Sequence, residues 1–238
     1  MMLDKGVEII AFDYGATLDT NGTHWYNIFH SEHIKENPSL TDMELRQAYI
    51  HAERTLSKER LIKPDDTFRE TLYKKVNLQM EYLLHNHHIK EIEAEQIRKI
   101  VDNSYLVAVN CTRNAKNLLQ NLKNRYKLVM ISNFYGNLQS VLVEFGLRDF
   151  FSCVAESAVV GYSKPDERLF VKAFESFDTD AGRCMMIGDS YNKDIIPAKR
   201  LGYKTVWLKG RPWQENPTST PLADETITDL SELERILI

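Results

Sequence analysis

Several short apolar runs in this 238-residue chain end in polar residues whose types could support catalysis. Asp13 follows VEIIAF, and Ser132 follows KLVMI. Asp189 follows CMMIG, and Asp194 comes five residues later, while Lys164 lies in GYSKPD. If the apolar runs are parallel strands, these residues stand at the carboxyl ends of strands, where open α/β sheets bind their ligands. Carboxylates, a hydroxyl and an ammonium group gathered at that edge would form a polar ligand site.

The elements that must position these residues alternate between strand and helix. The pattern predicts a doubly wound parallel sheet with helices on both faces, an α/β fold. We expect strands at 7–12, 127–131, 152–155, 184–187, 205–208 and 225–228. We expect the intervening helices at 112–124, 137–145, 166–177, 192–201 and 230–237, with a proline-containing loop at 210–223.

A polar, helix-forming segment interrupts this pattern after the first strand. Apolar residues at helical spacing predict four helices near 23–36, 41–58, 65–86 and 91–108. Thr41 followed by Glu44 is a capping-box pattern at the start of the second. The sequence therefore predicts two domains. A core is formed by residues 1–20 and 110–238, and a helical domain by residues 21–109.

Composition excludes several kinds of partner. The chain has 30 basic and 34 acidic residues, and a net charge of -4 gives no basic surface for nucleic acid. The sequence contains no run of about 18 apolar residues, so it predicts no membrane span. The first residues lack the pattern of a signal peptide. The three cysteines are few, odd in number and far apart. Reduced thiols in a cytoplasmic protein are the simplest interpretation, and the oligomeric state cannot be predicted.

The four polar segments resemble a known set of motifs. DYGAT, ISN, SKPD and GDSYNKD occur in this order, and they resemble the four motifs of the haloacid dehalogenase (HAD) superfamily. The resemblance extends from residue 7 to about residue 209. The helical segment after the first motif resembles the caps that this superfamily carries at that position. The resemblance implies a Rossmann-like core, an α-helical cap and hydrolase activity.

By this resemblance, Asp13 is the nucleophile of a phosphatase that acts on a small phosphorylated metabolite through an aspartyl-phosphate. Two unit charges about 4 Å apart at an effective dielectric of about 20 repel by about 4 kcal/mol, so the site must offset the repulsion between Asp13 and phosphate. Lys164 and a magnesium ion would do so. Ser132 would donate a hydrogen bond to the phosphoryl group, near the amide of Asn133. Thr17 would hold the loop geometry.

The resemblance also implies the metal ligands. Mg²⁺ would be bound by oxygen atoms of Asp13 and Asp189, by the backbone carbonyl of Gly15, by waters and by a phosphate oxygen. Asp194 would orient the waters around the metal or Lys164.

Gly15 departs from the pattern of the family. HAD phosphatases typically carry a second Asp two residues after the nucleophile, which protonates the leaving group and later activates water. General acid–base catalysis contributes about 10²–10⁴-fold, so the chain lacks this factor, takes it from elsewhere or performs different chemistry. His24, Tyr26 and Arg54 are candidates for the missing group. We also expect glycine here to adopt a backbone angle that aspartate would resist.

Three other functions remain open. Haloacid dehalogenases also lack the second Asp, but they use no metal and carry Ser or Asn in place of Asp189. A phosphonate-cleaving enzyme would need a cap lysine that forms a Schiff base, and Lys35, Lys58 and Lys63 are available. A catalytically degenerate member would bind a phosphometabolite or a protein partner without turnover.

Overall fold

The computed structural model describes residues 5–213 and 222–237, so most of the predicted loop at 210–223 lies outside the described residues. Its centre is a six-stranded sheet in the order β3-β2-β1-β4-β5-β6, in which every pair of neighbouring strands is parallel. The strands are β1 (Ile9–Phe12), β2 (Lys127–Ser132), β3 (Phe151–Glu156), β4 (Cys184–Gly188), β5 (Lys204–Leu208) and β6 (Glu225–Ile227). The predicted α/β fold with a parallel sheet is confirmed.

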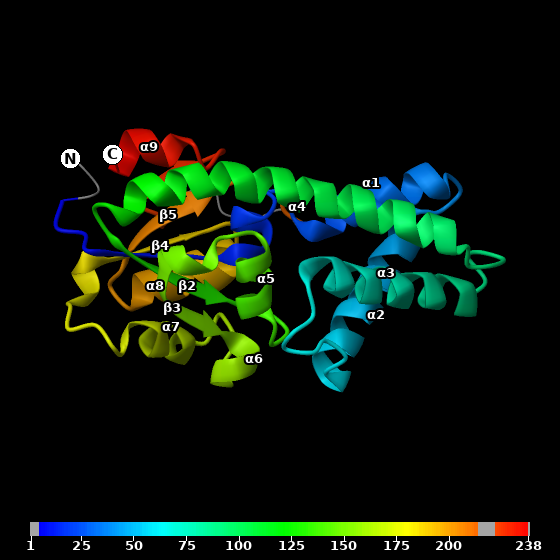
Figure 1. Ribbon diagram of the computed structural model, residues 1–238, viewed down its shortest axis with the longest axis horizontal. Helices are drawn as coiled ribbons and strands as arrows, with labels where there is room; N and C mark the ends of the chain where they lie inside the picture. Colours follow the sequence, from blue (N-terminus) through cyan, green and yellow to red (C-terminus); the bar gives the residue numbers. More distant parts are fainter. Residues whose placement is uncertain (1–4, 214–221, 238) are drawn as a thin grey trace.

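Helices cover both faces of this sheet (Figure 1). Alternate residues of β1 enter different apolar clusters, because successive side chains of a strand point to opposite faces. Ile10 and Phe12 belong to the cluster that contains residues of α4 (Ala94–Lys123), α5 (Leu138–Glu144) and α9 (Glu232–Leu237). Ile9 and Ala11 belong to the cluster that contains residues of α7 (Glu167–Phe174) and α8 (Ile196–Arg200). Both faces are therefore buried, as a doubly wound sheet requires.

The predicted helices at 91–108 and 112–124 are one helix. α4 runs without a break through Ala94–Lys123, and it extends from the other helices to the sheet (Figure 1). Its buried residues keep helical spacing across the predicted break, with Ala108, Thr112 and Ala115 on one face. Because the same apolar face continues through the predicted break, the helix remains buried along one side and does not end there.

Three further helices form a layer with the first half of α4. They are α1 (Trp25–Glu36), α2 (Asp42–Glu59) and α3 (Phe68–His85). α1 and α3 pack on α4, and α2 packs on α1 and α3. The predicted capping box at Thr41 and Glu44 is present, and a second one joins Thr67 to Glu70 at the start of α3. Apolar residues of these helices belong to the same cluster as one sheet face, so the helical layer and the sheet share a continuous core.

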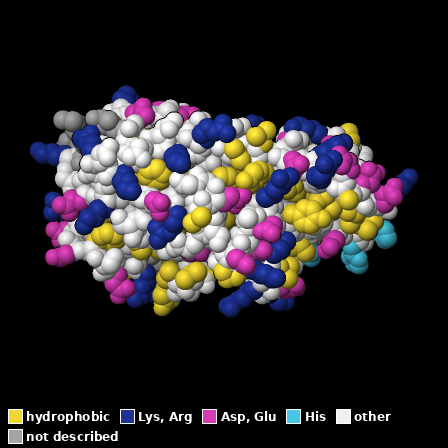
Figure 2. Space-filling view, viewed as in Figure 1, with side chains coloured by type: hydrophobic (Ala, Val, Ile, Leu, Met, Phe, Trp, Pro, Cys, Tyr) yellow, Lys and Arg dark blue, Asp and Glu magenta, His cyan; other side chains and the backbone are white. Residues whose placement is uncertain are grey.

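The surface agrees with the balanced composition. Basic and acidic side chains are interleaved over the face that Figure 2 shows. Among the described residues, no helix is long and apolar enough to cross a membrane.

The continuity of α4 can be tested at Asn110, an exposed residue in the middle of the helix. We expect Asn110→Pro to lower the free energy of unfolding by about 3 kcal/mol or more, because proline removes a hydrogen bond and clashes with the preceding turn. The control Asn110→Ala should change it by less than about 0.5 kcal/mol. Urea unfolding of both variants measures the difference. A tolerated proline would mean that the chain breaks here, as the sequence alone suggested.

Candidate active site

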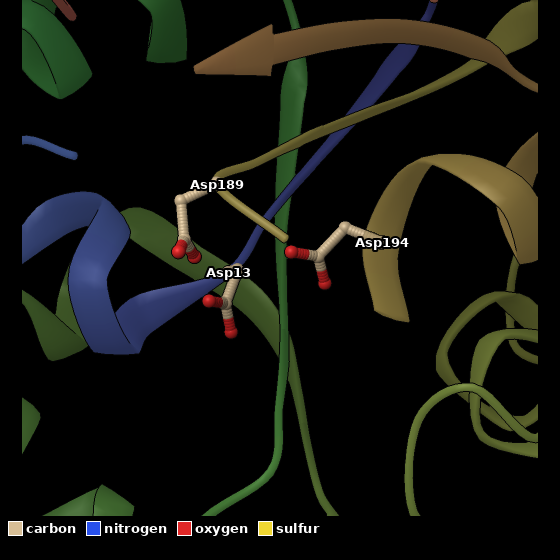
Figure 3. Close-up of side chains that lie close together, drawn as sticks. All are labelled: Asp13, Asp189 and Asp194. Carbon is tan, nitrogen blue, oxygen red and sulfur yellow. The ribbon is translucent and has the colours of Figure 1, made fainter. Parts of the chain in front are cut away.

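Three carboxylates converge at the carboxyl edge of the sheet (Figure 3). Asp13 follows β1, Asp189 follows β4, and Asp194 lies in the helical turn 191–195 that precedes α8. One oxygen atom from each lies within 4.8 Å of the others. The carboxyl ends of β1 and β4 meet because these two strands are neighbours in the sheet. The structure thus brings together the acidic residues that the sequence analysis selected.

Lys164 lies between two of these carboxylates. Its Nζ donates hydrogen bonds to Asp13 Oδ1 at 2.7 Å and to Asp194 Oδ1 at 2.6 Å, and it also donates to the carbonyl of Ile131. The ammonium group is almost completely buried. Burial alone would lower the pKa of Lys164, but the charges of Asp13 and Asp194 outweigh it and raise the pKa. Lys164 is therefore a permanent cation.

Two hydroxyl groups complete the contacts of Asp13. Ser132 at the end of β2 donates to Asp13 Oδ1 at 2.9 Å. Thr17 is fully buried, and its hydroxyl lies 3.4 Å from Asp13 Oδ2 and 3.3 Å from Asp189 Oδ1, so its single hydrogen is donated to one of the two or shared between them. It also accepts the amide hydrogen of Asp189. Thr17 therefore ties the loop after β1 to the end of β4, and Asp13 Oδ2 is the less constrained of the two oxygens.

Asn133 positions the loop that carries Lys164. Its Nδ2 donates to the carbonyl of Lys164 at 3.0 Å, and its Oδ1 accepts the amide hydrogen of the same residue at 2.8 Å. The side-chain amide is thus occupied by the backbone. Substrate binding by Asn133 and Thr17 stays a prediction.

The arrangement carries more negative than positive charge. Burial, and then the charges of Asp13 and Asp194, raise the pKa of Asp189 well above its usual range. Burial also raises the pKa of Asp194 to about 6, although Lys164 opposes the shift. Clustered carboxylate oxygens are the ligands that Mg²⁺ and Ca²⁺ prefer, and a divalent cation would relieve their repulsion. The residues present therefore fit a magnesium ion.

Gly15 has an ordinary backbone conformation, contrary to expectation. Its φ of -68° and ψ of 129° are accessible to any residue. A Cβ atom at this position would meet nothing within 4 Å. The left-handed residue of this loop is instead Ala16, with φ of 63°, and its amide hydrogen is accepted by the buried carboxylate of Asp19. The glycine is thus not required by the backbone.

A cavity of about 1080 Å³ opens in front of these residues, and the helical layer forms its opposite wall. Of the three candidates for the missing acid or base, His24 lines the cavity, whereas Tyr26 and Arg54 do not. Burial lowers the pKa of His24 to about 4, so its imidazole is neutral at pH 7. The hydroxyl of Tyr26 is bonded to Asp42 instead.

The wall also holds residues that the sequence analysis missed, namely Glu53, Lys75 and Tyr135. A signal was available for Lys75. It is buried on the face of α3 that also contains Leu72 and Val76, and charged residues are almost never fully buried unless they are paired. A lysine at an apolar position of an amphipathic helix is therefore a better candidate for a buried, paired residue than a lysine on the exposed face.

The turn at Asn21 and Gly22, which leads into α1, is tightly held. Gly22 donates to the carbonyl of Ala16 at 2.8 Å and accepts the amide hydrogen of Arg211 at 2.8 Å. Asn21 donates to Asp229 at 2.6 Å. The turn into α1 is thus bonded to two distant parts of the chain, at Arg211 and at Asp229.

Comparison with known proteins agrees with the fold and the motifs. The family model of haloacid dehalogenase-like hydrolases matches residues 8–202. The chain therefore belongs to the haloacid dehalogenase-like hydrolase family. Among solved structures, the HAD-hydrolase YfnB from Bacillus subtilis bound to magnesium has a TM-score of 0.58 at 21% identity, covering 97% of this chain and 98% of that one. A dehalogenase with an intermediate complex has a TM-score of 0.64 at 16% identity, covering 98% and 97%.

Curated relatives are more similar in sequence but match a shorter region. Pyrimidine 5'-nucleotidase YjjG of Escherichia coli is 33% identical over 125 residues, which cover 52% of this chain and 55% of that protein. Glyceraldehyde 3-phosphate phosphatase of Pyrococcus abyssi is 34% identical over 106 residues, which cover 44% of each chain. The chain thus spans about half the length of the curated relatives that it matches.

The metal assignment can be tested at Asp189. We expect Asp189→Asn to weaken magnesium binding by at least about tenfold, because one of the converging charges is lost while the shape is kept. The control Asp149→Asn, at an exposed position remote from the three carboxylates, should bind magnesium like the wild type. Calorimetric titration of both variants decides the question, and equal affinities would remove Asp189 from the metal site.

Proposed function

We propose that this protein is a magnesium-dependent phosphatase that hydrolyses a small phosphorylated metabolite through an aspartyl-phosphate on Asp13. The observation that carries the proposal is the contact of one carboxylate, Asp13, with a buried ammonium and a hydroxyl at the floor of a large cavity. Relatives at 33–34% identity that are named as a nucleotidase and a phosphatase support the same reaction class.

Each residue at the floor of the cavity has a separate role in this reaction. Asp13 Oδ2 attacks phosphorus, since Oδ1 is engaged by Ser132 and Lys164. The ester P–O bond breaks as the new bond forms, and the alcohol leaves as an alkoxide that takes a proton from water. The ammonium of Lys164 offsets the repulsion between carboxylate and phosphate. Ser132 is placed to donate to a phosphoryl oxygen once phosphate arrives. Water then hydrolyses the acyl-phosphate and restores Asp13.

Asp13, Asp189 and the backbone carbonyl of Gly15 would hold the magnesium ion. Asp194, which accepts hydrogen bonds from Lys164 and from the amide of Ser190, would orient the waters around the metal or Lys164. When bound, magnesium supplies positive charge that stabilises the transferring phosphoryl group.

Two observations weigh against the alternative reactions. A metal-free dehalogenase has no need of three clustered carboxylates. A Schiff-base lysine is activated by removal from solvent, whereas Lys63, the one of the three candidates that lines the cavity, is exposed. Lys75, the buried lysine of the helical wall, is paired with Glu53 at 2.6 Å. Burial would lower the pKa of Lys75, but Glu53 outweighs it and raises the pKa. The phosphatase therefore remains the better assignment.

We further propose that residues 21–109 act as a cap over the core of residues 1–20 and 110–238. The support is that α2 and α3 supply one wall of the cavity and the sheet edge supplies the other. The free thiols of Cys111, Cys153 and Cys184 support the cytoplasm as the compartment.

The nucleophile is tested with 4-nitrophenyl phosphate and magnesium. We expect the wild type to release phosphate and Asp13→Asn to lose at least about 10³-fold in kcat, because the amide is a far weaker nucleophile. The matched control Asp149→Asn should retain full activity. Release of chloride from 2-chloropropionate is measured in parallel, and halide release without phosphate release would reverse the assignment.

Gly15 generates a second test. Without an acid two residues after the nucleophile, the rate should depend steeply on leaving-group stability, and the aspartyl-phosphate should accumulate in a burst. Because the backbone angles at Gly15 suit any residue and a Cβ atom there would meet nothing within 4 Å, we expect Gly15→Asp to raise turnover of alkyl phosphates by about 10²-fold. Gly15→Asn has a similar shape but cannot transfer the proton, and it should give no gain. A shallow leaving-group dependence in the wild type would mean that another residue already acts as the acid.

A further inference from the structure

Three polar side chains form a closed cluster in the wall opposite the nucleophile. Lys75 Nζ on α3 lies 2.6 Å from Glu53 Oε1 on α2, and it donates to the hydroxyl of Tyr135 at 2.7 Å. The hydroxyl of Tyr135, in the loop after β2, donates to Glu53 Oε2 at 2.6 Å. One ammonium and one carboxylate thus neutralise each other around a shared hydroxyl, and all three residues line the cavity.

The cluster presents its acceptor to the cavity and hides its cation. The side chain of Lys75 is 7% exposed, whereas that of Glu53 is 30% exposed. The ammonium lies 5.0 Å from the ring centroid of Tyr135 and 5.9 Å from that of Tyr49, so aromatic rings screen it further. Because Glu53 Oε1 is itself buried, a ligand in the cavity can meet only Oε2 of this carboxylate, which accepts one hydrogen bond from Tyr135 and keeps a lone pair.

A neutral donor lines the same cavity. His24 Nδ1 accepts the amide hydrogen of Tyr26 at 3.1 Å. Because the imidazole is neutral, this bond places its proton on Nε2. The wall therefore offers donor and acceptor groups but no unpaired buried cation among the described residues that line it.

We propose that Glu53, Lys75 and Tyr135 form the specificity subsite for the leaving group, and that this subsite selects phosphate esters of uncharged, hydroxyl-bearing alcohols over esters that carry a carboxylate. The proposal rests on the proposed phosphatase function. A hydroxyl of the leaving group donates to Glu53. A carboxylate has no hydrogen to donate to Glu53, and it would meet this more exposed carboxylate before the buried ammonium of Lys75; such like-charge contacts suppress the wrong ligand.

Two esters of equal length provide the test. Glycerol 3-phosphate and 3-phosphoglycerate differ only in a hydroxymethyl group against a carboxylate. With magnesium present, we expect the wild type to favour glycerol 3-phosphate in kcat/KM by about tenfold or more. Equal efficiency, or a preference for the carboxylated ester, would overturn the proposal and place recognition at exposed cations such as Arg60 and Lys63, which also line the cavity.

Two variants shift the preference in opposite directions. Glu53→Gln leaves Lys75 as an unpaired cation, so the preference for glycerol 3-phosphate should fall by about tenfold. Lys75→Gln leaves an unpaired carboxylate, so the preference should rise. Opposite shifts cannot arise from a general loss of stability. Glu59→Gln, at an exposed position at the end of the same helix, is the matched control and should leave the ratio unchanged, whereas an unchanged ratio in Glu53→Gln would refute the subsite.

The same experiment separates this proposal from the proposed function. Release of phosphate from 4-nitrophenyl phosphate reports on the reaction alone. If no ester is hydrolysed, the phosphatase assignment fails, and calorimetric titration of the wild type with the two esters still measures the preference of the subsite. Hydrolysis of both esters with no discrimination would retain the phosphatase and eliminate the subsite.

Discussion

The buried ammonium of Lys164 is the charge on which the arrangement of the site depends. It bonds Asp13 and Asp194 at once, and all three groups are removed from solvent. A buried charge is tolerated only when it is paired and hydrogen-bonded. One cation cannot neutralise three converging carboxylates, and this imbalance is why the site fits a divalent metal ion.

The residues around this charge mainly fix the positions of the backbone and loops that carry the charged side chains. Asn133 fixes the backbone of Lys164, Thr17 joins the loops that carry Asp13 and Asp189, and Asp19 supports the left-handed Ala16. These contacts leave Asp13 Oδ2 lightly constrained and directed to the chemistry we propose. Preorganised donors cost no rearrangement during reaction. Gly15 contributes no side chain to the site, although neither the available space nor the backbone angles require a glycine there.

The two walls of the cavity differ in electrostatic character. The edge of the sheet gathers carboxylates and one cation, which suits phosphate and metal. The wall formed by α2, α3 and the loop after β2 holds a paired, neutral cluster, which suits an uncharged leaving group. None of the described hydrogen bonds or ion pairs links Glu53 or Lys75 to Asp13, so the two walls are not bonded to each other through these residues.

The sequence by itself determined the sheet and the carboxyl-edge residues. Buried strands read as continuous apolar runs, and each motif residue follows such a run, so Asp13, Ser132 and Asp189 could be placed without coordinates. The sequence pattern predicts a break in α4 because the residues near position 110 are polar, whereas the buried apolar face of the helix continues over many turns. Only the tertiary structure decided which residues Lys75 pairs with. Lys75 lies 60 residues from Tyr135 in the chain, and Glu53 lies 82 residues from it. No local pattern encodes such a pairing, because it arises from how α2 packs on α3 and where the loop after β2 meets them.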